Sequence, residues 1–324
     1  MEQGLIPEGS SETVLARCPS GYDVLGGSAF IDGTSAFAHI ESAAPLPDKR
    51  AYQVKIVNPL VNPFAGVPNA DASVIAGAIC AQSGKPVVVD GRFGKPQRSG
   101  ARREPGTVNL RFAEATGIEN NSITDVVSKC PSGYSAFGGG YAIGGSPWAH
   151  ASSILVASKD NAFAGVFVHP PFDPTLGILR QRAAMRVLAL CSETGRPLVL
   201  SSHAKVVGKS AAPKRKLRPT KPGNVVLVKR SVGGIKSGDV VSLIAPCPAG
   251  YSVFGGSYVI SDSALAHATG AGVLSQKNGY VADITNPPPN ISGGLPKTTA
   301  SVVVAALCAK NGQPIVIDTP FPQR

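Results

Sequence analysis

The segment "RCPSGYDVLGGSAF" at residues 17–30 is the most informative part of the sequence, because the chain contains two further versions of it. They read "KCPSGYSAFGGGYA" at residues 129–142 and "PCPAGYSVFGGSYV" at residues 246–259. Each version holds a Cys-Pro-x-Gly-Tyr motif followed by a pair of glycines. Self-similarity at long spacing indicates an architecture assembled from similar structural units.

The same landmarks follow each motif in the same order. The glycine pairs are Gly26-Gly27, Gly138-Gly139 and Gly255-Gly256, and Ala-His pairs then end at His39, His150 and His267. Alternating segments run into proline ("AYQVKIVNP", "AFAGVFVHPP", "GYVADITNPPP"), and an apolar stretch with a second cysteine closes each unit. The two cysteines of a unit are 62, 61 and 61 residues apart, which accounts for all six in the chain.

The local patterns favour β-strands. Segments such as 54–56 and 166–168 are short, β-branched and closed by proline, which cannot continue a strand ladder. "CAQSGKPVVVD" predicts a strand, a tight turn at Ser83-Gly84 and a second strand, and the dipeptide Asn311-Gly312 gives the strongest hairpin signal of the three units. No unit holds a helical period over three turns.

These patterns predict an all-β protein of three tandem antiparallel β-sandwich repeats, each with one internal disulfide, joined by basic extended linkers. The expected boundaries are 1–90 for unit 1, 91–105 for the first linker, 106–203 for unit 2, 204–222 for the second linker and 223–324 for unit 3.

The six cysteines are interpreted as three disulfides. The chain has no CxxC motif, which removes zinc ribbons and thioredoxin-like redox sites. A Cys2His2 zinc site that uses the repeated histidine is the alternative, although His39 has no second histidine near it in the sequence. The predicted pairs are Cys18–Cys80, Cys130–Cys191 and Cys247–Cys308.

Disulfides indicate an oxidising environment, so the expected location is a virion or the extracellular space. The N-terminal "MEQGLIPEGSSE" lacks the basic and apolar regions of a signal peptide. Either a signal was removed or the protein leaves the cell by lysis. No apolar run reaches the roughly 18 residues of a transmembrane helix, so no membrane span is expected.

The net charge of +11 comes from the two linkers, and the three units are neutral. Exposed soluble spacers are one interpretation, and contacts with an acidic surface are the other. The linkers offer Phe93 as their one aromatic residue, so sequence-specific nucleic-acid binding is not expected. The candidate contact residues are the twelve cations of the linkers: Arg92, Lys95, Arg98, Arg102, Arg103, Lys205, Lys209, Lys214, Arg215, Lys216, Arg218 and Lys221.

No motif in the sequence indicates catalysis. The stretch "GGGYAIGG" at residues 138–145 does not have the GxGxxG spacing of a dinucleotide site, and no Walker, HExxH or GxSxG motif occurs. Acidic residues do not recur as pairs at equivalent positions. We therefore expect no enzyme, no cofactor and no metal.

The recurring histidines have two interpretations. Each of His39, His150 and His267 could be a half-buried residue that hydrogen-bonds a backbone group. Alternatively, if the units pack around a pseudo-threefold axis, the three could meet and bind a metal ion. Trp148 stands where the other units have Phe37 and Leu265, which indicates an apolar packing position.

The motif Cys-Pro-[Ser/Ala]-Gly-Tyr-x-x-x-Gly-Gly resembles one in small β-domains of actinobacterial secreted proteins and of phage virion proteins. The resemblance covers all three units and brings no catalytic residues. It implies a non-enzymatic virion structural protein, such as a capsid decoration, tail or fibre component, whose partners are other virion proteins or an acidic surface. The alternative is a secreted or cell-surface binding module, lectin-like, for a glycan or wall polymer. Either protein could form a homo-oligomer.

Overall fold

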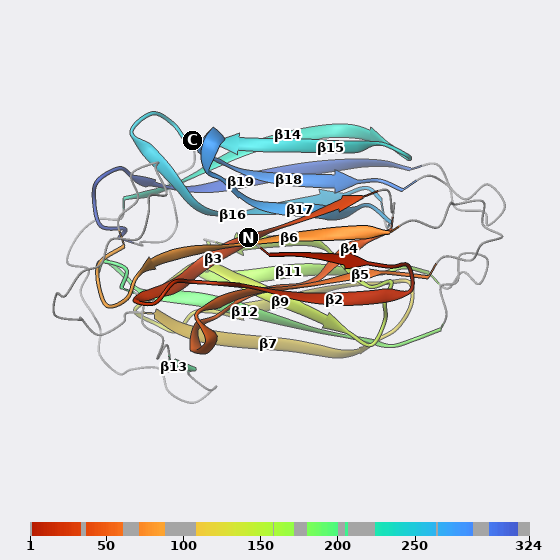
Figure 1. Ribbon diagram of the computed structural model, residues 1–324, viewed down its shortest axis with the longest axis horizontal. Helices are drawn as coiled ribbons and strands as arrows, with labels where there is room; N and C mark the ends of the chain where they lie inside the picture. Colours follow the sequence, from red (N-terminus) through yellow and green to blue (C-terminus); the bar gives the residue numbers. More distant parts are fainter. Residues whose placement is uncertain are drawn as a thin grey trace.

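The computed structural model describes residues 2–33, 37–60, 71–87, 108–157, 159–171, 180–199, 205–206, 224–263, 265–287 and 298–316. Within these ranges the chain forms β-strands and two 3-10 helices, Pro47–Lys49 and Ser275–Lys277, and no α-helix. The prediction of an all-β protein is confirmed. The strands run along the long dimension of the molecule (Figure 1).

Each unit contributes six long strands in the same order. Unit 1 forms β1 (Glu2–Ile6), β2 (Ser10–Arg17), β3 (Tyr22–Gly33), β4 (His39–Leu46), β5 (Ala51–Asn58) and β6 (Ala72–Gln82). Unit 2 forms β7 (Val108–Ile118), β8 (Ser122–Lys129), β9 (Tyr134–Gly144), β10 (His150–Ala157), β11 (Ala162–His169) and β12 (Ala183–Glu193). A short β13 (Lys205–Val206) follows. Unit 3 forms β14 (Val225–Lys236), β15 (Val240–Pro246), β16 (Tyr251–Ser261), β17 (His267–Leu274), β18 (Gly279–Thr285) and β19 (Thr299–Lys310).

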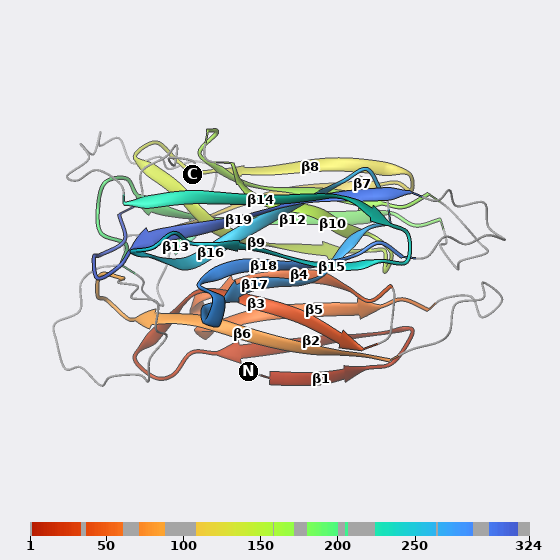
Figure 2. The same ribbon diagram turned by 90° about the horizontal axis from the view of Figure 1, so that it is seen from above.

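The strands assemble into three sheets, and each sheet combines strands of two units (Figure 2). Sheet 1 has the order β1-β6-β3-β17-β18-β15, sheet 2 has β13-β7-β12-β9-β4-β5-β2, and sheet 3 has β14-β19-β16-β10-β11-β8. The first, sixth and third strands of a unit therefore lie in one sheet, and its fourth, fifth and second strands lie in the next. All pairings are antiparallel except that of β13 with β7.

The expected sandwich within each unit is not confirmed, because no sheet belongs to one unit. Each unit instead divides its strands between two sheets, and the three sheets close a cycle in which every unit pairs with both others. The joints between units are short: two residue pairs join β3 to β17, two join β4 to β9, and two join β10 to β16. The predicted domain boundaries stay predictions.

The three units also meet through their backbones after the second cysteine. Val87 donates its N–H to the carbonyl of Leu198 at 2.8 Å, Leu198 to that of Ile315 at 2.7 Å, and Ile315 to that of Val87 at 2.7 Å. These residues occupy equivalent positions of the three units, and all are buried. The ring of three bonds places the units around a common pseudo-threefold axis.

The residues of this ring lie in the segments that were predicted to form hairpins after the second cysteine of each unit. The predicted turns exist, with Gly84, Gly195 and Gly312 at φ values of 66°, 72° and 68°. After each turn, however, the described residues of the chain bond to another unit. Pairing across the axis satisfies the backbone groups that a hairpin would have satisfied.

The Cys-Pro-x-Gly-Tyr motif forms a tight turn that leads into a strand. The N–H of Tyr22 donates to the carbonyl of Pro19 at 3.1 Å, and the same bond recurs in the other two units. The glycine before each tyrosine has φ of 81° to 84°, which is the conformation required at the third position of a type II turn. The motif is a strand-entry corner.

The glycine pairs create a β-bulge and a close contact. In each unit the residue before the pair (Leu25, Phe137 or Phe254) is an extra residue in the ladder with the neighbouring strand. A Cβ on the second glycine would overlap an aromatic ring: Tyr52 at Gly27, Phe163 at Gly139 and Tyr280 at Gly256. The pair therefore serves both as part of a bulge and as a position where an aromatic ring approaches the backbone closely.

Candidate functional site

The six cysteines form the three predicted disulfides, Cys18–Cys80, Cys130–Cys191 and Cys247–Cys308. The first cysteine of each pair follows the second strand of its unit, and the other lies in the sixth strand. Because these strands belong to different sheets, each disulfide ties two sheets together. The three disulfides thus link the three sheets pairwise, with one disulfide in each unit.

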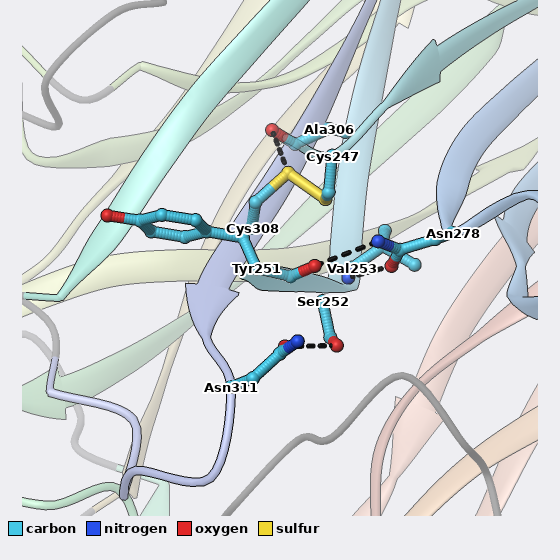
Figure 3. The surroundings of a disulfide bond; sticks show 8 residues. All are labelled: Cys247, Tyr251, Ser252, Val253, Asn278, Ala306, Cys308 and Asn311. Carbon is cyan, nitrogen blue, oxygen red and sulfur yellow. Dashed lines mark hydrogen bonds between the residues drawn. A yellow bond between two sulfur atoms is a disulfide. The ribbon is translucent and has the colours of Figure 1, made fainter. Parts of the chain in front are cut away.

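An asparagine reinforces this corner in units 2 and 3. Asn278 donates from Nδ2 to the carbonyl of Tyr251 at 2.8 Å and accepts from the N–H of Val253 at 3.0 Å (Figure 3). Asn161 makes the same pair of bonds in unit 2. Both have positive φ, as does Arg50 at the equivalent position of unit 1, at 48°. No sequence motif had pointed to this position, although its constant spacing to the following aromatic residue was an available signal.

The three recurring histidines meet on the pseudo-threefold axis. Their ring centroids lie 5.8 Å apart for His39 and His150, 5.6 Å for His39 and His267, and 5.6 Å for His150 and His267. Each histidine begins the fourth strand of its unit and is 3% exposed. They are therefore fully buried, where half-burial was expected.

Each imidazole bonds a backbone carbonyl through Nδ1, as the first interpretation predicted. The acceptors lie two residues earlier, at Phe37 (2.9 Å), Trp148 (3.2 Å) and Leu265 (2.9 Å). The carbonyl can only accept, so Nδ1 carries the proton and Nε2 is unprotonated in a neutral ring. All three Nε2 atoms are buried and have no hydrogen-bond partner.

The environment of the three rings opposes their protonation. Burial lowers the pKa of His39 and His150 and lowers that of His267 to about 4. The neighbouring imidazoles lower the pKa values of His150 and His267 further, because like charges repel. Backbone carbonyls oppose these shifts, but burial is the larger effect.

The three imidazoles come together, but their arrangement does not indicate a metal site. Among the residues that the structure describes, no three His, Cys, Asp or Glu side chains are arranged to hold a metal ion. The imidazoles instead contact one another at interplanar angles of 60° to 65°. The cluster is a packed set of neutral rings.

Buried tyrosines form the next layer on the axis. Tyr141 of unit 2 donates its hydroxyl to the carbonyl of Ile40 in unit 1 at 3.0 Å. Burial, together with the nearby phenol of Tyr258, raises the pKa of Tyr141 well above its usual value. Burial likewise raises the pKa of Tyr258. Both phenols are neutral hydrogen-bonding groups at the contact between units.

A small cavity of about 50 Å³ is enclosed by residues of all three units. It is lined by equivalent residues of all three units, including the glycine pairs and the aromatic rings of Tyr52, Phe163 and Tyr280. Pockets for small-molecule ligands are usually about 300–1,000 Å³. The cavity is therefore too small for a typical small-molecule ligand.

A polar side chain before the first proline of each alternating segment was also missed. Asn58, His169 and Asn286 are at most 1% exposed. They bond the carbonyls of Ile6 at 3.1 Å, Ile118 at 3.2 Å and Ile235 at 3.0 Å, respectively. The repeated "NP" and "HP" dipeptides were the available signal.

The basic linker residues fall outside the described residues, except Lys205 in β13, so their contacts with a polyanion stay a prediction. No helix in the described part of the chain is long and apolar enough to cross a membrane. No protein-family model matches the chain, and no curated protein matches it.

Proposed function

We propose that this protein is a non-enzymatic structural component of a virion, a capsid decoration, tail or fibre protein that attaches through its β-units and basic linkers. The observation that carries the proposal is the closed, stapled body, in which three similar units surround one axis within a single chain. Three similar faces around an axis can make three similar contacts with a threefold-symmetric site.

The charge distribution supports attachment to an acidic surface. The linkers at 91–105 and 204–222 supply the whole net charge of +11, while the units are neutral. Weak contacts by several units and linkers add up through effective concentration, so none needs a deep pocket. The resemblance of the corner motif to that of phage virion domains points to the same class.

Particle composition tests this proposal directly. Gradient-purified particles from the lysed host, analysed by peptide mass mapping, are expected to contain the polypeptide in fixed stoichiometry with the major capsid or tail protein. Replacing the twelve linker cations by serine should weaken rebinding to particles stripped of the protein and reduce its salt dependence. Absence of the polypeptide from purified particles would contradict the proposal.

The second candidate is a secreted or cell-surface binding module, which the three disulfides favour because they suit an extracellular setting. A wall-polymer pull-down and a glycan array with the intact protein distinguish the two. Saturable binding to a glycan, without incorporation into particles, would replace the first proposal by the second.

A further inference from the structure

We propose that His39, His150 and His267 form an acid-sensitive latch: protonation of the cluster parts the three units at their sheet joints, while the disulfide-stapled corners stay closed. The inference concerns the body of the protein and holds for either function above.

The joints are short pairings. Each consists of two residue pairs, whereas β3 and β6 within unit 1 share eleven. The contacts between units therefore also rest on the backbone ring of Val87, Leu198 and Ile315 and on the side chains around the axis. His39, His150 and His267 lie on β4, β10 and β17, the strands that each joint takes from one of its two units.

The buried cluster offers little to accommodate added protons. Nδ1 of each ring already donates to a carbonyl, so a new proton goes to the buried Nε2. The backbone carbonyls of Ala149, Ala266 and Ala38 favour the charged rings, but burial is the larger effect. Once two rings are charged, the cations stand 5.6 to 5.8 Å apart in the interior. Charges that are buried and only partly compensated are costly.

The surrounding ionisable groups do not neutralise this charge. Tyr141 and Tyr258, on β9 and β16, are neutral. Glu41 on β4 is paired with Lys55 on β5. On the outer strands, Asp283 of β18 accepts from Ser242, and His169 of β11 bonds Ser146 at 3.0 Å. Among the described residues, the side chains whose charges act on the three imidazoles are the imidazoles themselves.

The direction of the pH effect follows from the lowered pKa values. An imidazole in the open state has its ordinary pKa of 6.5, whereas that of His267 in the closed state is about 4. The closed state therefore binds fewer protons, so its stability is complete above pH 6.5 and falls as the pH drops towards 4. Each such histidine changes the opening equilibrium up to about tenfold per pH unit, and three change it up to about a thousandfold.

The fluorescence of Trp148 can report on the contact between units 1 and 2. It is the only tryptophan, it is 5% exposed, and its ring packs against Phe37 of unit 1 at 5.5 Å. We expect its emission maximum to shift to the red cooperatively between pH 6.5 and 4, with an uptake of about three protons. The β-sheet signal in circular dichroism should persist through this transition.

Asparagine variants test whether the proton uptake and the Trp148 shift come from the three histidines. An amide at position 39, 150 or 267 can still donate to the carbonyl two residues earlier but does not titrate. Each of His39→Asn, His150→Asn and His267→Asn should lower the proton uptake by about one, and the triple variant should abolish the shift in this pH range. The matched control is His169→Asn, which introduces the residue of the other two units; because burial lowers the pKa of His169 as well, this variant removes up to one proton from the total uptake but should leave the midpoint pH of the Trp148 shift unchanged.

A measurement on the unmodified protein covers the case in which the variants do not fold. Nitrogen-15 labelling of the histidines reports ring protonation by NMR, and three imidazoles should stay neutral at pH 6 and take up protons together with the Trp148 shift. The latch is refuted by Trp148 emission that stays constant down to pH 4. It is equally refuted by cluster histidines that protonate near pH 6.5 while the emission stays constant, or by a triple variant with the proton uptake of the original protein.

Discussion

At the scale of single residues, the corner beside each disulfide shows how one position can differ among similar units. Asn161 and Asn278 adopt positive φ and each ties two backbone groups of the next strand. Arg50 has the same backbone conformation but makes neither of these bonds. Asparagine tolerates the left-handed region better than arginine does.

We therefore expect Arg50→Asn to stabilise the protein by about 1 kcal/mol, because the amide would remove backbone strain and add bonds to residues 22 and 24. Urea unfolding followed by circular dichroism measures the change. Asn278→Arg is the matched reverse variant and should destabilise the protein by at least as much. Equal stability of Arg50→Asn and the original protein would contradict the assigned role.

The second glycine of each pair is the other residue-scale constraint. A Cβ at Gly139 would overlap both the Phe163 ring and the carbonyl oxygen of Leu188, and the backbone atom cannot move aside cheaply. We expect Gly139→Ala to cost about 3 kcal/mol or more, in the upper range for an overpacked core. Gly138→Ala is the control, because its nearest contact for a Cβ is 3.7 Å. Similar unfolding midpoints for the two variants would contradict this account.

At the scale of elements, the disulfides act between sheets. Each joins the end of a strand in one sheet to a strand of the next, over 61 or 62 residues of chain. Closing a loop of this length restricts the unfolded chain by about 4 kcal/mol on the loop-entropy model.

Replacing Cys130 and Cys191 by alanine should therefore lower the free energy of unfolding by about 4 kcal/mol, measured by urea titration under non-reducing conditions. The same double substitution at Cys18 and Cys80 provides a comparison in unit 1. Mass mapping without reduction checks the pairing first, and free thiols in the unmodified protein would contradict it.

At the scale of the whole molecule, the shared sheets make each unit depend on the others. A single unit would leave its third strand without a neighbour from the next unit and would expose its axial residues, which are buried in the complete body. Three copies of one unit could restore the cycle of sheets, because the six strands of each have the same arrangement.

We therefore expect residues 223–324, produced alone with the Cys247–Cys308 bond intact, to form a homotrimer. Size-exclusion chromatography with light scattering measures its mass, and the intact protein at the same concentration is the reference. A folded monomer would show that the contacts between units contribute little to stability.

The local features of this protein can be predicted from the order of its residues. The repeat, the strand content, the turn at each Cys-Pro-x-Gly-Tyr motif, the bulge at each glycine pair and the three cysteine pairs follow from residue type and spacing. The bond from each recurring histidine to a backbone carbonyl was one of two interpretations that the residue pattern left open. These features depend on backbone conformation within a few residues, or on a spacing that recurs three times.

Which strands share a sheet and which histidines meet became apparent only in the folded protein. The pairing of β3 with β17 joins residues some 240 positions apart through two residue pairs, and the pattern of either strand would suit a partner in its own unit equally well. His39, His150 and His267 each look alone in the sequence. They come together because the three units pair edge to edge around one axis. The resulting burial is the main cause of their lowered pKa values.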